Sequence, residues 1–335
     1  MENQHLLSVI LNYRTPEMTL NSATALLAQT KGMSASLVIV DNASDDGSFE
    51  ILQAGPNGEG WNEEDWVTVI QSPKNGGFGA GNNFGIRAGM AANKKPDLVY
   101  VLNSDAFPDQ GSISALIKGL KQNPQAGFAG SYIHGPEGEP HITAFRFPTM
   151  LSELEGAARF GPISRKLANF TVALPMPKET QTVDWLAGAS LMMRREVLDE
   201  IGLFDETFFL YFEETDLCQR AARAGWQTLY VCESAVTHIG SVSTGMKKWT
   251  RMPRFWFQSR QHYFIKNHGR FYTACATVLH MLGAIIHRTR AILSGKRVIG
   301  PKWFLRDLLL FSLTSGHLNR TVNEPELGKD EEVIS

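Results

Sequence analysis

Short apolar runs alternate with helical patterns over the first hundred residues, and this alternation restricts the chain to few folds. The runs predict strands at Leu6 to Leu11, Ser36 to Asp41, Val67 to Gln71 and Leu98 to Leu102. Helices are expected between them, near Pro16 to Ala28, Asp46 to Leu52 and Ala80 to Ala92. Strands rich in β-branched residues and separated by helices are typical of a parallel sheet covered on both faces. The sequence therefore predicts an α/β fold with a mostly parallel central sheet flanked by helices.

The second part of the chain has a less regular pattern. From about Ile142 the alternation loosens through several prolines, which predicts a loop-rich region. Order returns with a predicted strand from Val183 to Arg194, a helix from Phe212 to Ala224 and a strand from Gln227 to Cys232. The N-terminus has no basic segment before its short apolar run, so it predicts a first strand and neither a signal peptide nor a membrane span.

Composition excludes several classes of protein. The chain has 32 Lys and Arg against 34 Asp and Glu, a net charge of −2, so it is not built to coat nucleic acid. Its three cysteines show no C-x-x-C spacing, which argues against a disulfide framework and a thiolate zinc site. A reducing compartment fits this cysteine content best.

Charge is nevertheless divided unevenly along the chain. Between Ser234 and Arg306 there are 13 basic residues and no acidic one, around an apolar stretch from Phe271 to Ile286 that is short for a spanning helix. Two interpretations stay open: binding to an anionic membrane surface, or packing against the acidic remainder of the chain. We expect a first domain over residues 1–245, a basic helical region with a C-terminal helical segment over 246–322, and a flexible acidic tail over 323–335.

Polar residues follow the predicted strands where an open α/β sheet binds its ligand. Asn12 and Tyr13 follow the first strand, and Asp41 ends the second, where it could accept hydrogen bonds from a base or ribose; a helix cap and turn is the alternative. The glycine loop from Gly76 to Gly81 permits close approach of a ligand to the backbone, or forms an ordinary turn. It lacks the spacing of the dinucleotide fingerprint.

Carboxylates supply the candidate chemistry. Asp105 follows the buried fourth strand, where a divalent cation would neutralise it; capping of a helix near Gly111 is the alternative. An aromatic run precedes Glu213, Glu214 and Asp216, and such an apolar wall raises a carboxyl pKa toward that of a general base. A helix start alone also favours acidic residues. His238 follows a strand and is either a metal ligand or structural.

Taken together, these residues resemble the family 2 glycosyltransferases of the GT-A fold, in particular their bacterial rhamnosyltransferase-like branch. The resemblance covers about Leu6 to Thr244 and continues more weakly to Gly269. It depends on an ordered set of motifs, which are Val38 to Ser44, Asn75 to Asn83, Leu102 to Asp105, Trp185 to Ala189, Phe212 to Cys218 with Arg220, and His238.

The resemblance implies roles for individual residues. Asp41 would contact the nucleotide base beside Asn12 and Tyr13, Asp105 would be the last residue of the D-x-D metal motif, and His238 would complete the metal and diphosphate site. Glu214 would be the catalytic base. The nucleotide-sugar site would also include Gly77, Asn82, Asn103, Ser104 and Trp185.

The chain departs from the family pattern at two positions. Asn103 stands at the first D-x-D position, where the family pattern has the Asp that would contact metal or ribose. Glu214 stands where an Asp is expected, so Glu213 or Asp216 could serve as the base instead.

The implied activity is inverting transfer of a sugar, with rhamnose favoured, from a nucleoside-diphosphate sugar to a saccharide or lipid-linked saccharide acceptor in surface polysaccharide synthesis. A divalent cation, Mg²⁺ or Mn²⁺, would stabilise the departing diphosphate. The expected location is cytoplasmic, peripheral at the inner face of the membrane, with no nucleic-acid partner. The alternatives are a noncatalytic nucleotide-sugar-binding or scaffold protein of the same fold and a nucleotidyltransferase; the latter usually has a basic glycine-rich first turn, which Asn12 to Pro16 do not provide.

Overall fold

The four predicted N-terminal strands form one half of a nine-stranded sheet in the computed structural model, which describes residues 4–58, 61, 66–92, 94–240, 249–298 and 300–314. They are β1 (Leu6–Asn12), β2 (Ala35–Asp41), β3 (Val67–Gln71) and β4 (Leu98–Asn103), and they pair in parallel in the order β3-β2-β1-β4. This half of the sheet confirms the prediction. All four strands end at the same edge, which brings their polar tips together.

The other half of the sheet is mixed. Strand β10 (Ser190–Arg194) lies antiparallel between β4 and β6 (Ala126–His134), and β11 (Gln227–His238) runs parallel to β6. Two short strands, β5 (Ala106–Pro108) and β8 (Gln181–Val183), pair antiparallel with β11. The single strand predicted from Val183 to Arg194 is three separate strands, because β9 (Trp185–Leu186) leaves the sheet to pair with β7 (Ala144–Phe145).

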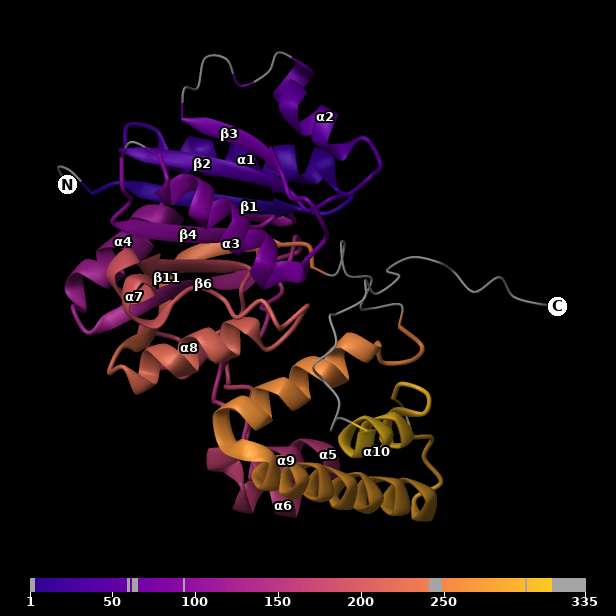
Figure 1. The fold of residues 1–335 in the computed structure, drawn as a ribbon. Coiled ribbons are helices and arrows are strands. Elements are labelled where there is room, and N and C mark those ends of the chain that lie inside the picture. The colour runs from indigo at the N-terminus through magenta and orange to yellow at the C-terminus, as the bar shows by residue number, and fades with distance from the viewer. Residues whose placement is uncertain are drawn as a thin grey trace.

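Helices cover both faces of the sheet (Figure 1). They are α1 (Pro16–Thr30), α2 (Ser48–Ala54), α3 (Gly77–Met90), α4 (Ser112–Gln122), α7 (Arg195–Ile201) and α8 (Glu213–Arg223), with a 3₁₀ turn at Pro56–Gly58. Alternate residues of β1 face opposite layers: Leu6 and Ile10 belong to one buried core, and Leu7 and Val9 to the other. The predicted α/β fold is therefore present.

Most glycines of α3 serve packing. A Cβ atom would lie 2.5 Å from Leu11 at Gly81 and 2.3 Å from Leu7 at Gly89. The helix can approach β1 this closely only because these positions have no side chain. The glycine pattern that suggested a ligand loop is thus explained largely by contact between helix and strand.

A group of four helices lies below the sheet in Figure 1: α5 (Met150–Ala158), α6 (Gly161–Lys166), α9 (Arg254–Leu293) and α10 (Phe304–Thr314). The prediction of a loop-rich region after Ile142 was wrong for α5 and α6, which are followed by a 3₁₀ turn at Ala168–Phe170. Helix α5 begins with a capping box between Thr149 and Ser152. Helix α5 packs on α9 and α6 packs on α5, and both are short, so their formation depends on a distant segment of the chain.

Helix α9 is 40 residues long and is interrupted at Gly269, where φ is 84°. Among the described residues it is the one helix long and apolar enough to cross a membrane, with 28% of its apolar window buried. The apolar stretch predicted to end at Ile286 lies within this helix, which continues to Leu293. Lys247, Lys248 and the acidic tail over 323–335 lie outside the described residues.

We predict that Gly283→Ala destabilises the helical group. A Cβ at Gly283 would lie 2.6 Å from the carbonyl oxygen of Leu154 in α5, so the two helices would have to separate. The expected loss is about 1–3 kcal/mol in the free energy of unfolding, measured by thermal or urea denaturation.

Gly156→Ala is the matched control, because Gly156 lies in α5 and no atom lies within 4 Å of the place that an added methyl group would occupy. This change should leave stability unchanged or raise it by up to about 1 kcal/mol through helix propensity. Equal behaviour of the two variants would contradict the close α5–α9 contact.

Candidate active site

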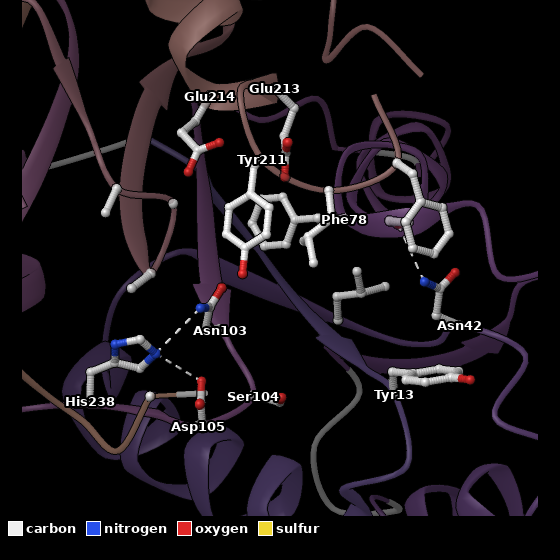
Figure 2. A pocket seen from close by; sticks show the side chains of 18 of the residues that line it. Tyr13, Asn42, Phe78, Asn103, Ser104, Asp105, Tyr211, Glu213, Glu214 and His238 are labelled. Carbon is white, nitrogen blue, oxygen red and sulfur yellow. Dashed lines mark hydrogen bonds and ion pairs between the residues drawn. The ribbon is translucent and has the colours of Figure 1, made fainter. Parts of the chain in front are cut away.

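A cavity of about 560 Å³ lies at the carboxyl ends of β1 and β4 (Figure 2). Its walls come from the tip of β4, the start of α3, the segment between β9 and β10, the turn before α8 and the end of β11. Nine residues predicted to form the site line it, namely Tyr13, Gly77, Asn103, Ser104, Asp105, Trp185, Glu213, Glu214 and His238. The structure therefore brings together predicted residues that are up to 225 positions apart in the sequence, from Tyr13 to His238.

Asp41 lies behind the wall of this cavity. It is fully buried and accepts hydrogen bonds from Asn12 Nδ2 at 2.9 Å and Gln71 Nε2 at 3.1 Å. The backbone N–H and the hydroxyl of Ser44 also donate to it, at 3.2 and 2.5 Å. These contacts use both carboxylate oxygens, so Asp41 fixes the tips of β1, β2 and β3 relative to one another.

Two further predicted residues lie outside the cavity lining. Asn12 is fully buried, and its Oδ1 accepts from Thr19 Oγ1 at 2.8 Å, which ties β1 to α1. Asn82 is also fully buried and donates to the carbonyl of Phe78 at 3.0 Å. Both amides hold backbone beside the cavity.

A strained turn places the two glutamates at the start of α8. Tyr211 and Phe212 have φ of 70° and 72°, a conformation that costs bulky residues about 1–3 kcal/mol each. Phe212 is the residue before the first helical position, so the turn sets the direction in which Glu213 and Glu214 point. Figure 2 shows both carboxylates directed into the cavity beside the Tyr211 ring.

The first half of α9 holds this turn in place. Phe212 packs against Tyr263 and Trp256, with ring centroids 5.4 and 6.1 Å apart, and Tyr211 stacks on Phe255 at 6.3 Å. Ser259 Oγ donates a hydrogen bond of 3.0 Å to the carbonyl of Leu210. These aromatic contacts supply the packing energy that offsets the backbone strain.

Burial raises the pKa of both glutamates. The pKa of Glu213, which is 2% exposed, is raised well above 4.5 by burial first and by the charge of Glu214 second. Burial also raises the pKa of Glu214, and a backbone hydrogen bond from Gly188 partly offsets this rise because it stabilises the ionised form. Within the part of the chain that the structure describes, Oε2 of each glutamate is buried without a hydrogen-bond partner. A carboxylate with a raised pKa is a stronger base than an exposed one.

Asp216 has a different position from the two glutamates. It is fully buried behind the cavity and forms ion pairs with Arg220 at 2.9 Å and Lys266 at 2.8 Å. Asn267 Nδ2 donates to its other oxygen at 3.2 Å. Since Lys266 and Asn267 belong to α9, Asp216 joins α8 to α9.

Asp105 and His238 form the polar group at the other side of the cavity in Figure 2. Asp105 Oδ1 lies 3.0 Å from His238 Nε2, and Asn103 Nδ2 lies 3.5 Å from the same ring nitrogen. Asn103 Oδ1 is buried and accepts no hydrogen bond from the described residues. An imidazole and a carboxylate suit a divalent cation, whereas Asn103 turns its amide nitrogen, and not its oxygen, toward His238 (Figure 2).

These groups alone are too few to complete a metal site. In the described ranges, no three His, Cys, Asp or Glu residues gather closely enough to hold a metal ion. A cation at Asp105 and His238 would therefore need oxygens from a bound phosphate group or water, as Mg²⁺ sites commonly do.

A second cavity of about 270 Å³ adjoins the first, since Tyr13 and Asn75 line both. Its other walls include Arg14, Gln71 and Lys74. The two cavities together offer space for an extended ligand with a polar end near β2 and β3.

Several lining residues were missed by the sequence interpretation. His141 packs edge-on against His238 at 6.2 Å, and Phe145 stacks on Trp185 at 4.2 Å. Phe145 belongs to the segment from about Ile142 that was predicted to be loop-rich, and His141 directly precedes it; neither carried a local signal. Gly188 was also missed. A Cβ there would lie 3.0 Å from Phe78 and 3.7 Å from Glu214 Oε1, so the absence of a side chain leaves room for both residues in the cavity wall.

Comparisons with known proteins agree with this geometry. The family model described as "Glycosyltransferase like family 2" matches residues 4–263. An N-acetylglucosaminyl-diphospho-decaprenol L-rhamnosyltransferase of Mycobacterium tuberculosis is 30% identical over 72% of this chain and 78% of its own length. The low-salt glycan biosynthesis hexosyltransferase Agl10 of Haloferax volcanii is 28% identical over 64% of this chain and 61% of its own.

Solved structures show the same fold at low sequence identity. A mannosyltransferase from Pyrobaculum calidifontis, solved with GDP-Man and Mn²⁺, is 13% identical with a TM-score of 0.52, over 92% of this chain and 85% of that one. GalNAc-T7, solved with UDP, GalNAc and Mn²⁺, is 14% identical with a TM-score of 0.56, over 95% of this chain and 59% of that one.

We predict that Glu213→Gln makes the protein more stable at neutral pH. A raised carboxyl pKa means that the folded state binds the proton more tightly than the unfolded state, so ionisation above 4.5 costs stability. Removing the charge should raise Tm by about 2 °C or more, which corresponds to roughly 1 kcal/mol in a domain of this size.

The gain should shrink as the pH falls toward 4.5, where Glu213 becomes protonated in both states. Glu50→Gln, at an exposed position of α2, should leave Tm nearly unchanged at every pH. A lower Tm for Glu213→Gln than for the unmodified protein at pH 7 would show that the ionised form is stabilised in the fold.

Proposed function

This chain belongs to glycosyltransferase-like family 2, and we propose that it transfers a sugar from a nucleoside-diphosphate sugar to a lipid-linked saccharide, with inversion at the anomeric carbon. The family membership confirms the resemblance predicted from the motifs. The observation that supports the reaction best is one cavity with buried glutamates at one side and the Asp105–His238 pair at the other. Rhamnose from dTDP-rhamnose is the proposed donor sugar, since the Mycobacterium tuberculosis relative is named as a rhamnosyltransferase.

We propose Glu214 as the base. It lines the cavity and is more exposed than Glu213, and its hydrogen bond from Gly188 stabilises the ionised form. Glu214 would take the proton of the acceptor hydroxyl as that oxygen attacks the anomeric carbon. Asp216 is a poor candidate because its oxygens are engaged by Lys266, Arg220 and Asn267.

Asp105 and His238 are the proposed residues that hold a divalent cation together with the donor diphosphate. When bound, the cation would stabilise the negative charge of the departing nucleoside diphosphate. The unsatisfied Oδ1 of Asn103 supports a polar ligand elsewhere in the same cavity. The choice between Mg²⁺ and Mn²⁺ depends on the availability of each metal in the cell as well as on its affinity for the site. The two structural neighbours were solved with Mn²⁺.

We propose that the nucleotide base occupies the second cavity beside Tyr13. Asp41 would then act as a positioning residue, because it holds Gln71, which lines that cavity, through a hydrogen bond of 3.1 Å. The glycine at position 77 lets the segment before α8 pack against the start of α3, because a Cβ there would lie 1.8 Å from the carbonyl oxygen of Phe209. Gly77 would thus shape the wall of the donor site through its backbone.

We place the reaction at the cytoplasmic face of a membrane, with peripheral attachment. Support comes from the lipid-linked acceptor named for the Mycobacterium tuberculosis relative and from the cysteine content. A saccharide on a polyprenyl diphosphate is the acceptor class that this location predicts.

The reaction is tested by incubating the protein with dTDP, UDP and GDP sugars and a short-chain polyprenyl-diphospho-saccharide, and measuring nucleotide release and product mass. Glu214→Gln should lower kcat by roughly two orders of magnitude or more while donor binding persists. The rate of the unmodified protein should fall as pH decreases through a pKa above 4.5, since only ionised Glu214 can accept the proton.

Glu50→Gln serves as the matched control and should keep full activity. If Glu214→Gln retains activity while Glu213→Gln loses it, the base is Glu213. If no donor is cleaved by the folded protein in the presence of any acceptor, transferase activity of this cavity is refuted.

The cation role is tested by donor affinity with and without Mn²⁺, measured by calorimetry. Asp105→Ala should abolish the gain in affinity that Mn²⁺ gives, because its carboxylate is the one anionic ligand proposed for the ion. His238→Ala should reduce the same gain and change donor affinity less in the absence of Mn²⁺.

Asp109→Asn provides a matched control from a second Asp–His pair. Asp109 Oδ2 lies 2.9 Å from His134 Nε2, beside the same strands but outside the cavity lining. The Asp109→Asn variant should show the same gain in donor affinity with Mn²⁺ as the unmodified protein. An undiminished response in folded Asp105→Ala would place the cation elsewhere.

A further inference from the structure

The second half of α9 is apolar on two opposite faces. One face is buried against α5 and includes Ala276, Gly283 and Ala291. The other contains Phe271, Val278, Leu282, Ile285 and Ile292, which are between 48% and 84% exposed. Their separations of 7, 4, 3 and 7 positions place them on one stripe of the helix, which we call the outer face of α9.

Exposure of so many large apolar side chains along one stripe is unusual for a protein surface. Scattered single residues need no explanation, but a contiguous apolar patch marks an interaction site. Helix α10 packs on α9 through Phe311 and Phe257, whose rings stack at 5.3 Å, and it exposes Leu309, Leu310 and Leu313. Trp303, immediately before α10, is 62% exposed.

The charge around the outer face indicates what covers it. Residues 150–170 and 254–314 contain 13 Lys and Arg but three Asp and Glu. The rest of the chain contains 19 Lys and Arg but 31 Asp and Glu. Two of the three acidic residues are in ion pairs, Glu153 with Arg260 at 2.8 Å and Asp307 with Arg251 at 2.7 Å. The helical group therefore presents an excess of positive charge next to its apolar stripe.

We propose that the outer face of α9, together with the exposed leucines of α10, inserts into the surface of a bilayer that contains anionic phospholipid. Apolar side chains would enter the boundary between headgroups and acyl chains, and Arg270, Arg288, Lys296 and Arg297, all exposed, would contact lipid phosphates. The acidic remainder of the chain would be repelled from the same surface, which orients the molecule. The proposal deepens the proposed function, since it names where a lipid-linked acceptor would meet the protein.

Contacts on the buried face of α9 favour a helix that lies on the membrane rather than one that crosses it. Arg260 is 1% exposed and pairs with Glu153, which His280 also contacts at 2.8 Å. This cluster holds α9 against α5 along the side opposite the outer face. A spanning α9 would expose the buried charges to hydrocarbon, at a cost of several kcal/mol.

The same helix connects the membrane surface to the cavity. Before Gly269, α9 packs on Tyr211 and Phe212 and pairs with Asp216 through Lys266; after Gly269 it carries the outer face. Attachment through the second half would hold the cavity at a fixed height above the bilayer.

Vesicle flotation of the full chain, without donor or acceptor, tests the proposal. The protein should float with vesicles of phosphatidylglycerol and phosphatidylcholine at low salt, and much less with phosphatidylcholine alone. Leu282→Glu combined with Ile285→Glu should reduce binding at least about tenfold, because it places charge in the inserted stripe. Lys296→Gln combined with Arg297→Gln should weaken binding about fivefold for each charge removed, and 1 M salt should have a similar effect on the unmodified protein.

Ile51→Glu is the matched control, since Ile51 is an exposed apolar residue of α2 outside the helical group, and it should float normally. Donor cleavage toward a soluble acceptor should be unchanged in the Leu282 and Ile285 variant, so loss of membrane binding is separable from loss of transferase activity. Failure of the unmodified protein to bind anionic vesicles at low salt would overturn the proposal. So would light scattering that shows a dimer dispersed by the Leu282 and Ile285 changes, because the outer face would then be covered by a second copy.

Discussion

Two residues with positive φ, Tyr211 and Phe212, determine where helix α8 begins and therefore where Glu213 and Glu214 point. Neither residue favours this conformation by itself, so the turn depends on the rings of α9 that pack against it. Burial in the resulting wall raises the pKa of both glutamates. A carboxylate that lowers stability when it is ionised is also a stronger base. Burial of the two glutamates therefore favours the proposed proton transfer and at the same time lowers the free energy of unfolding.

Helices α9 and α10 supply no residue to the lining of the cavity, yet α9 helps to position the glutamates that line it. Lys266 bonds Asp216 of α8 and Asp205 before it, at 2.8 and 2.7 Å, so one side chain of α9 fixes both ends of the segment that carries the glutamates. The basic helical region therefore contributes, through Lys266, to the position of the segment that carries the glutamates.

Local patterns were sufficient to predict the N-terminal half of the sheet, because β1, β2 and β4 are mostly apolar, buried runs that end in a polar tip, and the edge strand β3 is rich in β-branched residues. They also placed Asp105, Glu214 and His238 on one cavity through the ordered motifs. The insertion of β10 between β4 and β6 could not be predicted, since antiparallel pairing there depends on partners about 60 to 96 positions away. Helices α5 and α6 were missed because they are short and stabilised mainly by packing that depends on α9. Likewise, only the fold distinguishes Asp216, which is neutralised by Lys266, from Glu214, two positions earlier.

The anomeric configuration of the product tests the central claim most directly. A single displacement assisted by one carboxylate base reverses the configuration of the donor sugar, whereas a covalent enzyme intermediate would need two displacements and would retain it. The configuration can be determined by NMR from the one-bond coupling at the anomeric carbon of the purified product, with the donor as reference. We expect inversion. Retention of the donor configuration would contradict a single displacement assisted by Glu214.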